Sequence, residues 1–273
     1  MTRLIVHPGF HKTATTTVQT QLAEARATLA PDWVVLLRDD LLDAPAAARA
    51  YCGPRATLDL GLFQAALADV LEPHARAPGV VISCEGLCGH MPGRPGIEDY
   101  SAAPALMAAL AATARKIFGP ALDLQFYLST RMAQPWLESV HWQHVRTGTL
   151  TEECADFCAR MNGAAALDTI VAAIAEAASA PVQAVPIEAS TQMAQGPITP
   201  LLDLMGLPEP ARSGFRAQDR RNGRPRRADP TKLANRLAQI NRRFPPEEAR
   251  RRKAAVLAPA PKPAQTTAAK DTP

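Results

Sequence analysis

Short apolar runs alternate with longer amphipathic stretches along most of the chain. The apolar runs predict β-strands, because they are rich in branched or aromatic side chains and are bounded by turn residues. The predicted strands are residues 4–7, 33–37, 80–83, 124–130 and, as an edge strand, 182–187. Apolar positions three or four residues apart predict helices instead. The predicted helices are one that carries Val18, Leu22, Ala25 and Leu29, then residues 60–71, 102–118, 154–178 as one or two helices, 198–205 and 230–244.

This alternation predicts the α/β class. Strands separated by helices favour a mostly parallel central sheet with crossover helices on both faces, a three-layer sandwich. The chain has 273 residues, and we expect one such domain over residues 1–253. Residues 254–273 are mainly Ala, Pro, Lys and Thr. They have almost nothing to bury, so they are predicted to form a disordered tail.

Composition narrows the class of protein. Apolar residues make up 47% of the chain, which supports a sizeable core and excludes wholesale disorder. The most apolar stretches, residues 102–112 and 163–181, are too short or are broken by acidic residues, so we expect no membrane span. The first strand begins at residue 4, so we expect no signal peptide. The chain has five cysteines. Because an odd number cannot all pair in disulfides, we expect free thiols in a reducing cytoplasm.

Positive charge is concentrated near the C-terminus. Residues 212–253 hold fifteen Lys or Arg and four Asp or Glu, a local balance of +11 in a chain of net charge +4. This segment is interpreted as a nucleic-acid arm, a face for an acidic substrate, a flap over cofactor phosphates, or a solvated helix. Its only aromatic residues are Phe215 and Phe244. Base stacking has few platforms there, so nucleic acid is not the partner we expect.

The loop after the first predicted strand carries the clearest chemical signal. The apolar run breaks at Pro8 and Gly9, and Lys12 is followed by threonines at 13 and 15–17 as a helix begins. This order directs backbone N–H groups and the positive end of a helix at one spot, which suits a phosphate or sulfate. Lys12 adds a charge, and the threonines add hydroxyl donors. A plain helix cap is the alternative interpretation of the threonines.

A second anion site is predicted after strand 124–130. Arg131 ends that strand, and Pro135 suits the first turn of a helix that carries Trp136 and Ser139. The planar fork of the Arg and the hydroxyl of the Ser can reach the same anion. An ordinary surface helix start is the alternative.

Together these segments resemble those of sulfotransferases that use 3'-phosphoadenosine 5'-phosphosulfate (PAPS). That family typically reads Pro-Lys-Thr-Gly-Thr-Thr after its first strand, and residues 11–16 here read His-Lys-Thr-Ala-Thr-Thr. His11 replaces the proline. Ala14 replaces a glycine, the residue that permits positive φ and close backbone approach. The family holds the 3'-phosphate of PAPS with an Arg and a Ser eight positions apart, and Arg131 and Ser139 have that spacing.

The resemblance implies a P-loop NTPase-like sulfotransferase topology and an enzyme that needs no metal. The implied reaction moves a sulfuryl group from PAPS to a hydroxyl or amine of a glycan, lipid or small metabolite. Lys12 would be catalytic, because it would neutralise charge on the bridging oxygen. The implied PAPS-binding residues are His11, Lys12, Thr13, Ala14, Thr15, Thr16, Thr17, Arg131 and Ser139, together with Arg220 and Arg221 in a basic loop similar to one that closes over the 3'-phosphate in the family.

Glu85 is the predicted catalytic base. It follows strand 80–83 and should therefore lie at the same carboxyl edge of the sheet as the anion loops. We expect burial to raise its pKa toward neutrality. A Ser-x-Glu after an apolar strand also resembles the glutamate-base variant among glycan and bacterial sulfotransferases. His90, His7 and His11 are alternative bases, and the alternative role for Glu85 is a helix cap or a partner of an Arg.

Two other functions compete with this one. A P-loop-like kinase or nucleotide hydrolase would use Thr13 and Glu85 at a magnesium site. However, Gly9 precedes Lys12 by three residues, where a Walker A motif needs five. A non-catalytic polyanion binder would instead use residues 212–253.

Two weaker groupings complete the candidates. Cys84 with Cys88, and Cys154 with Cys158, have a spacing that suits stacking on one helix face better than a zinc site. His141 and His144 share a predicted helix face. They are interpreted either as contacts to the substrate or as surface histidines.

Overall fold

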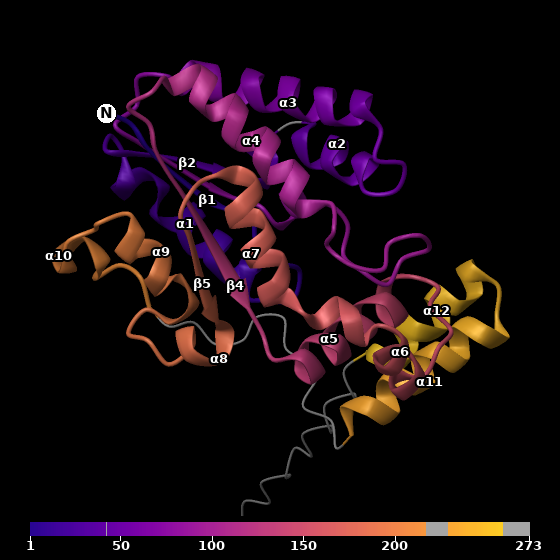
Figure 1. Cartoon of the computed structure of the whole chain (residues 1–273). Coiled ribbons are helices and arrows are strands. Elements are labelled where there is room, and N and C mark those ends of the chain that lie inside the picture. Colours follow the sequence, from indigo (N-terminus) through magenta and orange to yellow (C-terminus); the bar gives the residue numbers. More distant parts are fainter. Residues whose placement is uncertain (42, 217–228, 259–273) are drawn as a thin grey trace, which may run out of the picture.

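Five parallel strands form the centre of the molecule (Figure 1). The computed structural model describes residues 1–41, 43–216 and 229–258. The strands are β1 Arg3–His7, β2 Trp33–Leu37, β3 Gly79–Ser83, β4 Asp123–Thr130 and β5 Val182–Pro186. Their order in the sheet is β2-β3-β1-β4-β5, and every neighbouring pair is parallel. The predicted α/β class and parallel central sheet are confirmed, and β5 is the predicted edge strand.

Helices connect the strands and extend beyond the last one. They are α1 Thr15–Leu29, α2 Ala44–Tyr51, α3 Thr57–Leu71, α4 Ala103–Phe118, α5 Ala133–Thr147, α6 Cys154–Arg160, α7 Leu167–Ala178, α8 Ile187–Ser190, α9 Thr199–Leu204, α10 Glu209–Arg212, α11 Pro230–Arg243 and α12 Pro246–Leu257. Short 3₁₀ turns are η1 Arg38–Leu41, η2 Glu72–His74, η3 Glu85–Cys88, η4 Asn162–Ala165 and η5 Gly196–Ile198. The predicted stretch 154–178 is two helices, α6 and α7.

The sheet separates two hydrophobic cores. Leu4 and Val6 of β1 pack in the core formed with α2, α3, α4 and α7, whereas Ile5 packs in the core formed with α1 and α9. This alternation follows the two-residue period of a strand. Because both faces are covered, the strands read as continuous apolar runs. The arrangement is a three-layer sandwich. In the described part of the chain, no helix is both long enough and apolar enough to cross a membrane.

The strand order places a topological switch point, the position at which open α/β sheets have their ligand crevice, between the carboxyl ends of β1 and β4. From β1 the chain passes through α1 to β2, on one side, and from β4 it passes through α5 to α7 and then to β5, on the other. In open α/β sheets, ligands bind where neighbouring strands send their connections in opposite directions. The loop of residues 8–14 follows β1, and Arg131 follows β4. The topology therefore brings the two predicted anion segments to this switch point.

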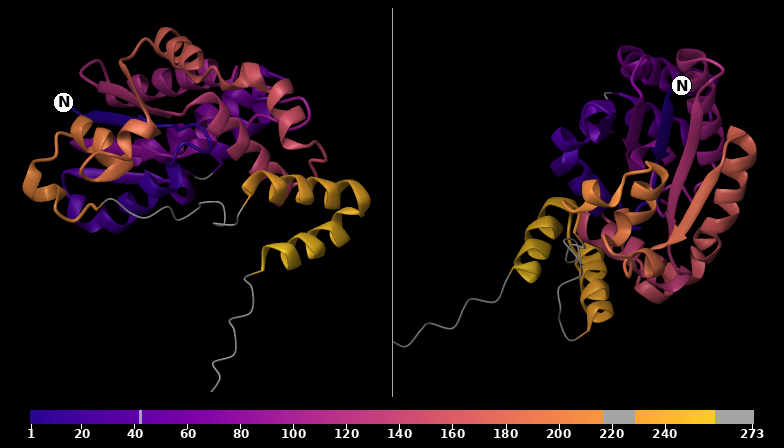
Figure 2. Two further views of the ribbon diagram at one scale, coloured as in Figure 1. Left: turned by 90° about the horizontal axis from the view of Figure 1, so that it is seen from below. Right: turned by 90° about the vertical axis from the view of Figure 1, so that its left-hand side faces the viewer.

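Helices α11 and α12 form a hairpin at one end of the molecule (Figure 2). Leu233 and Leu237 of α11 pack against Trp142 and Val145 of α5. Helix α12 continues to Leu257 because its last apolar residues reach this same cluster. Residues 254–257, predicted to be disordered, are thus helical, and residues 259–273 of the predicted tail lie outside the described residues.

Candidate functional site

The loop between β1 and α1 is built from left-handed backbone conformations. Gly9, Lys12 and Ala14 have φ values of 56°, 70° and 67°. A Cβ on Gly9 would lie 2.5 Å from Cγ2 of Thr15, so this position accepts only glycine. Ala14 is the N-cap of α1 and adopts the conformation that glycine permits, at a cost of about 1–2 kcal/mol. The loop therefore keeps its shape with alanine in place of glycine, but with added strain.

The first turn of α1 presents unsatisfied donors. Ala14 has no side chain that could cap the helix, and the turn contains no acidic residue. Among the described residues, the backbone N–H groups of Thr15 and Thr16 have no hydrogen-bond acceptor, whereas that of Thr17 is bonded to the Ala14 carbonyl at 3.0 Å. Such N–H groups at the positive end of a 15-residue helix form a site suited to an anion.

The threonine hydroxyls divide into two kinds. Thr13 is buried, and its hydroxyl donates to the Phe10 carbonyl at 2.6 Å. Thr13 therefore braces the loop and offers no hydroxyl to a ligand, in contrast to the predicted PAPS-binding role, and it is equally unsuited to hold magnesium. Thr16 is exposed and Thr17 is half-buried, so both lie at the surface of the first helical turn.

The two predicted anion segments are in direct contact. Nη1 of Arg131 donates to the Lys12 carbonyl at 3.0 Å, across 119 residues of sequence. Helix α5 begins two residues after Arg131, with no side-chain cap and no acidic residue in its first turn. One carboxylate approaches from α8, where Glu188 accepts from the backbone N–H of Met132 at 3.3 Å. Two helix N-termini and two cations thus meet at the switch point between β1 and β4.

Helix α5 is fastened to the loop along one face. Nε1 of Trp136 donates to the His11 carbonyl at 2.9 Å, and Nζ of Lys12 donates to Oε1 of Gln143 at 3.3 Å. Ser139 is half-buried and lies three positions after Trp136 and four before Gln143. Residues at this spacing share a helix face. Ser139 therefore lies on the face of α5 that contacts the loop.

Tyr100 determines the state of the His11 imidazole. The Tyr100 hydroxyl accepts from the backbone N–H of His11 at 2.8 Å and lies 2.9 Å from Nδ1 of His11. It has no other acceptor among the described residues, so its proton is directed at Nδ1, and the imidazole proton is on Nε2. Burial lowers the pKa of His11 to about 4, against the opposing effect of Glu85. His11 is thus a neutral hydrogen-bond donor near pH 7.

Glu85 lies beside this loop as predicted but is a stronger acid than predicted. It opens η3 directly after β3, and Nε2 of Gln19 on α1 donates to its Oε2 at 2.6 Å. Burial pushes its pKa upward. The Gln19 hydrogen bond, the backbone N–H of Glu85 and the nearby charge of Arg38 outweigh burial, and the pKa is lowered. The expected shift toward neutrality is wrong, and Glu85 is ionised near pH 7.

His7 and His90, two of the alternative bases, differ in whether a substrate can reach them. His7 is fully buried, with Nδ1 2.8 Å from Oγ of Ser83 and its ring stacked on Tyr127 at 5.0 Å between centroids. No substrate proton can reach it. His90 is half-buried at the surface near the loop, and its pKa is lowered by burial and by nearby arginines. His90 stays an alternative to Glu85.

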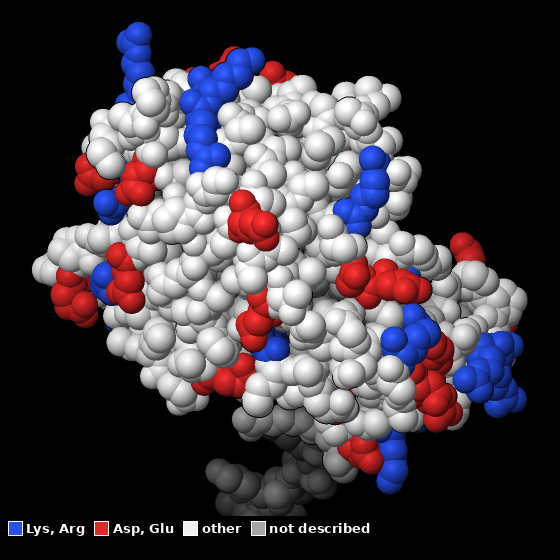
Figure 3. All heavy atoms as spheres, viewed as in Figure 1, with Lys and Arg blue, Asp and Glu red and all other residues white. Residues whose placement is uncertain are grey.

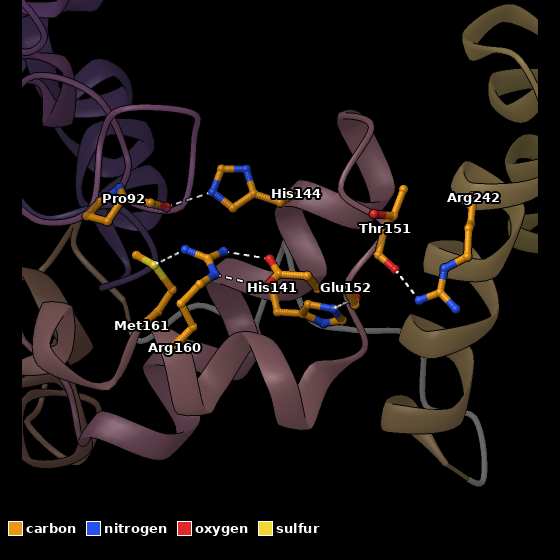
Figure 4. Close-up of polar contacts among 8 residues, drawn as sticks. All are labelled: Pro92, His141, His144, Thr151, Glu152, Arg160, Met161 and Arg242. Carbon is orange, nitrogen blue, oxygen red and sulfur yellow. Dashed lines mark hydrogen bonds and ion pairs between the residues drawn. The ribbon is translucent and has the colours of Figure 1, made fainter.

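His141 and His144 have structural roles. Both are buried on α5 and point to different neighbours (Figure 4). Nε2 of His141 donates to the Glu152 carbonyl at 2.9 Å, and Nε2 of His144 donates to the Pro92 carbonyl at 2.7 Å. The interpretation as surface histidines was wrong, because both rings are buried and bonded to backbone carbonyls.

The remaining candidates do not join the site. All five cysteines are buried. Cys154 and Cys158 stack on α6 with their sulfur atoms 3.9 Å apart. Among the described residues, no three His, Cys, Asp or Glu side chains gather where they could hold a metal ion. Arg220 and Arg221 lie outside the described residues.

Gln19, Tyr100 and Gln143 were missed by sequence reasoning. Gln19 follows Thr15 by four positions and Gln143 follows Ser139 by four, so helical spacing from the predicted residues could have identified both. Nothing local identifies Tyr100, which meets His11 across 89 residues.

A cavity of about 310 Å³ opens at the opposite, amino edge of the sheet. It is lined by Arg3 and Asp123 among others, and these two are already paired at 2.8 Å. The backbone N–H groups of Thr15 and Thr16, which have no acceptor among the described residues, lie at the carboxyl edge, and this makes that edge the better candidate. Comparisons of the chain with protein-family models, with curated proteins and with solved structures found no match.

Proposed function

We propose that this protein is a PAPS-dependent sulfotransferase with a P-loop-like topology. The observation that carries the proposal is the contact between Arg131 and the Lys12 loop, which brings the two predicted anion segments together at the carboxyl edge of the sheet. PAPS carries a phosphosulfate at one end and a 3'-phosphate at the other, and it supplies a sulfuryl group on a phosphate leaving group. Two adjacent cationic segments suit such a ligand.

Different residues would bind the two ends of PAPS and accept the proton of the acceptor. The N–H groups of Thr15 and Thr16 and the ammonium of Lys12 would hold the phosphosulfate, and Lys12 would offset charge on the bridging oxygen. Arg131 and Ser139 would hold the 3'-phosphate. Glu85, already ionised, would accept the proton of the attacking hydroxyl or amine.

The competing functions fit these residues less well. A magnesium-dependent kinase needs a free hydroxyl directly after the lysine, and that of Thr13 is buried and bonded to Phe10. The described part of the basic segment is divided between two places. Residues 229–253 form most of the α11–α12 hairpin, which packs on Trp142 and Val145 of α5, whereas Phe215 packs in the core with α1 and α9. A polyanion-binding role would use the exposed cations of the hairpin rather than Lys12 and Arg131.

Calorimetry with adenosine 3',5'-bisphosphate tests the proposal. We expect binding that needs no magnesium, and a loss of about tenfold or more for Lys12→Ala and for Arg131→Ala, because each removes a charged hydrogen-bond donor. Arg76→Ala, at the amino edge of the sheet, should bind normally. Thermal unfolding of each variant distinguishes a loss of contacts to the nucleotide from a loss of folding. Absence of heat with this nucleotide, alongside tight binding of ATP, would reject the proposal.

A further inference from the structure

Charged side chains follow four adjacent strands in a definite order. Arg38 follows β2 and Glu85 follows β3, while Lys12 lies after β1 and Arg131 after β4. The register pairs Leu37 with Ser83, so the ends of β2 and β3 are level. If the nucleotide binds between the carboxyl ends of β1 and β4, Glu85, after β3, lies at the edge of the nucleotide site. A second substrate must then approach Glu85 from the β2 side.

That side is lined by cations from three separate elements. Arg38 opens η1 beside Glu85, and its charge contributes to the lowered pKa of that carboxyl. Arg49 lies on α2, with Nη1 3.4 Å from the place where a Cβ on Gly86 would be. Arg94 belongs to the turn before α4, and the charges of Arg94 and Arg49 both reach His90.

The side chains of these three arginines make no ion pair in the described part of the chain. They make no side-chain hydrogen bond there either, although other arginines are paired, as Arg160 is with Glu152. Glu85, whose pKa the charge of Arg38 helps to lower, is bonded to Gln19. Neighbouring cations that make no ion pair repel one another and attract an anion. Planar guanidinium groups bind carboxylates, phosphates and sulfates well.

We propose that the acceptor carries its own negative charge, and that Arg38, Arg49 and Arg94 bind this charge while Glu85 faces the hydroxyl or amine to be modified. This inference rests on the proposed function. In the reaction, the acceptor oxygen or nitrogen bonds to sulfur as the bond from sulfur to the phosphate oxygen breaks. The acceptor proton passes to Glu85, and the electron pair of the broken bond leaves on the nucleotide phosphate.

Arginine side-chain NMR tests binding without turnover. The full-length protein, saturated with adenosine 3',5'-bisphosphate, is titrated with glucuronate, glucose 6-phosphate or uncharged glucose. We expect either anion to shift the side-chain signals of Arg49 and Arg94, and glucose to leave them in place. If neither anion moves these signals more than glucose does, the inference is overturned.

Matched variants separate this site from the nucleotide site. Arg49→Gln and Arg94→Gln should each weaken binding of the shifting anion about tenfold and leave the nucleotide affinity within about twofold. Arg76→Gln is the control. A variant that weakens the nucleotide instead would place its arginine in the donor site and overturn the inference. If the wild-type protein binds no nucleotide, the proposed function fails, whereas the same titration without nucleotide still reports whether the arginines bind anions.

Discussion

Ala14 shows how one residue can preserve a loop at a cost. Its φ of 67° lies in the left-handed region, where an alanine Cβ crowds the backbone. Glycine relieves this crowding, and a β-branched residue increases it.

We therefore expect Ala14→Gly to keep or raise the free energy of unfolding by up to about 1 kcal/mol, and Ala14→Val to lower it by about 2 kcal/mol. Urea unfolding of the two variants measures both effects. Equal stability of the two variants would show that the loop is not held in this conformation.

The neutral state of His11 is a second property of a single residue. Because its pKa is lowered to about 4 and Tyr100 donates to Nδ1, the ring should stay neutral, with its proton on Nε2, from pH 8 to pH 5. Nitrogen NMR of the imidazole measures this directly. In Tyr100→Phe we expect a mixture of tautomers at His11, with His144 unchanged because it is bonded to Pro92. Titration of His11 near pH 6.5 in the wild type would contradict this account.

At the scale of elements, α5 connects the loop of residues 8–14 with the α11–α12 hairpin. Its first turns contact the loop through Trp136, and its last carbonyls are capped by the hairpin. Nζ of the buried Lys253 donates to the carbonyls of Val145 and Gly148 at 2.9 and 2.7 Å. A cation at a helix C-terminus satisfies carbonyls that have no partner within the helix and offsets the negative end of the dipole.

Replacement of Lys253 by methionine should lower the free energy of unfolding by about 1–3 kcal/mol. Methionine has a similar unbranched side chain but no donor, so the Gly148 carbonyl loses its bond and the Val145 carbonyl keeps only that from Asn241. Hydrogen exchange should accelerate in α11, α12 and the end of α5. Arg251→Met, on the exposed side of α12, is the control. A Lys253→Met protein with unchanged exchange would show that the cap does not hold the hairpin.

The elements differ in how well the sequence predicts them. The strands are buried on both faces, so their apolar runs stand out and their limits fall within a residue of the prediction. Helix α2 is short and rich in alanine. Helix α12 contains a run of three arginines and a lysine, and nothing local shows that Lys253 is buried. Both helices depend on contacts with other elements.

The candidate site divides in the same way. The loop of residues 8–14 and the Arg131 segment are local patterns that chain order alone brings to one edge of the sheet. The lowered pKa of Glu85 comes from Gln19, 66 residues away in sequence. Burial alone suggested the opposite direction, because the sequence does not show which side chain donates to the carboxylate.

Across the whole molecule, ionisable side chains lie in two contrasting environments, the exposed hairpin and the buried sheet. Lys and Arg side chains gather at the right-hand edge in Figure 3, over the α11–α12 hairpin. The exposed cations of the hairpin are Lys232, Arg236, Arg242, Arg243, Arg250, Arg251 and Arg252. At the other extreme, His7 is buried at the centre of the sheet, and burial lowers its pKa to about 4.

His7 should make the fold sensitive to acid. An unfolded chain with its histidine at 6.5 binds more protons than the folded chain between pH 6.5 and pH 4, so stability falls as the pH drops through this window. His7 alone should lower the free energy of unfolding by about 2 kcal/mol at pH 5 relative to pH 8.

Urea unfolding at pH 8 and pH 5 measures this difference. In His7→Gln we expect the difference to shrink by about 2 kcal/mol, even if the variant is less stable at both values. A difference of the same size in wild type and variant would show that another group causes the acid sensitivity.

The buried cysteines have a practical consequence. Burial raises the pKa of Cys84 to about 11, and it also raises those of Cys52 and Cys88. The thiolate is the form that reacts with maleimides, so the folded protein should be labelled slowly at neutral pH. An Arg251→Cys protein would then take up one fluorophore on the hairpin without removal of any native cysteine. The emission of this fluorophore would show whether a ligand bound at the loop of residues 8–14 changes the surroundings of the hairpin.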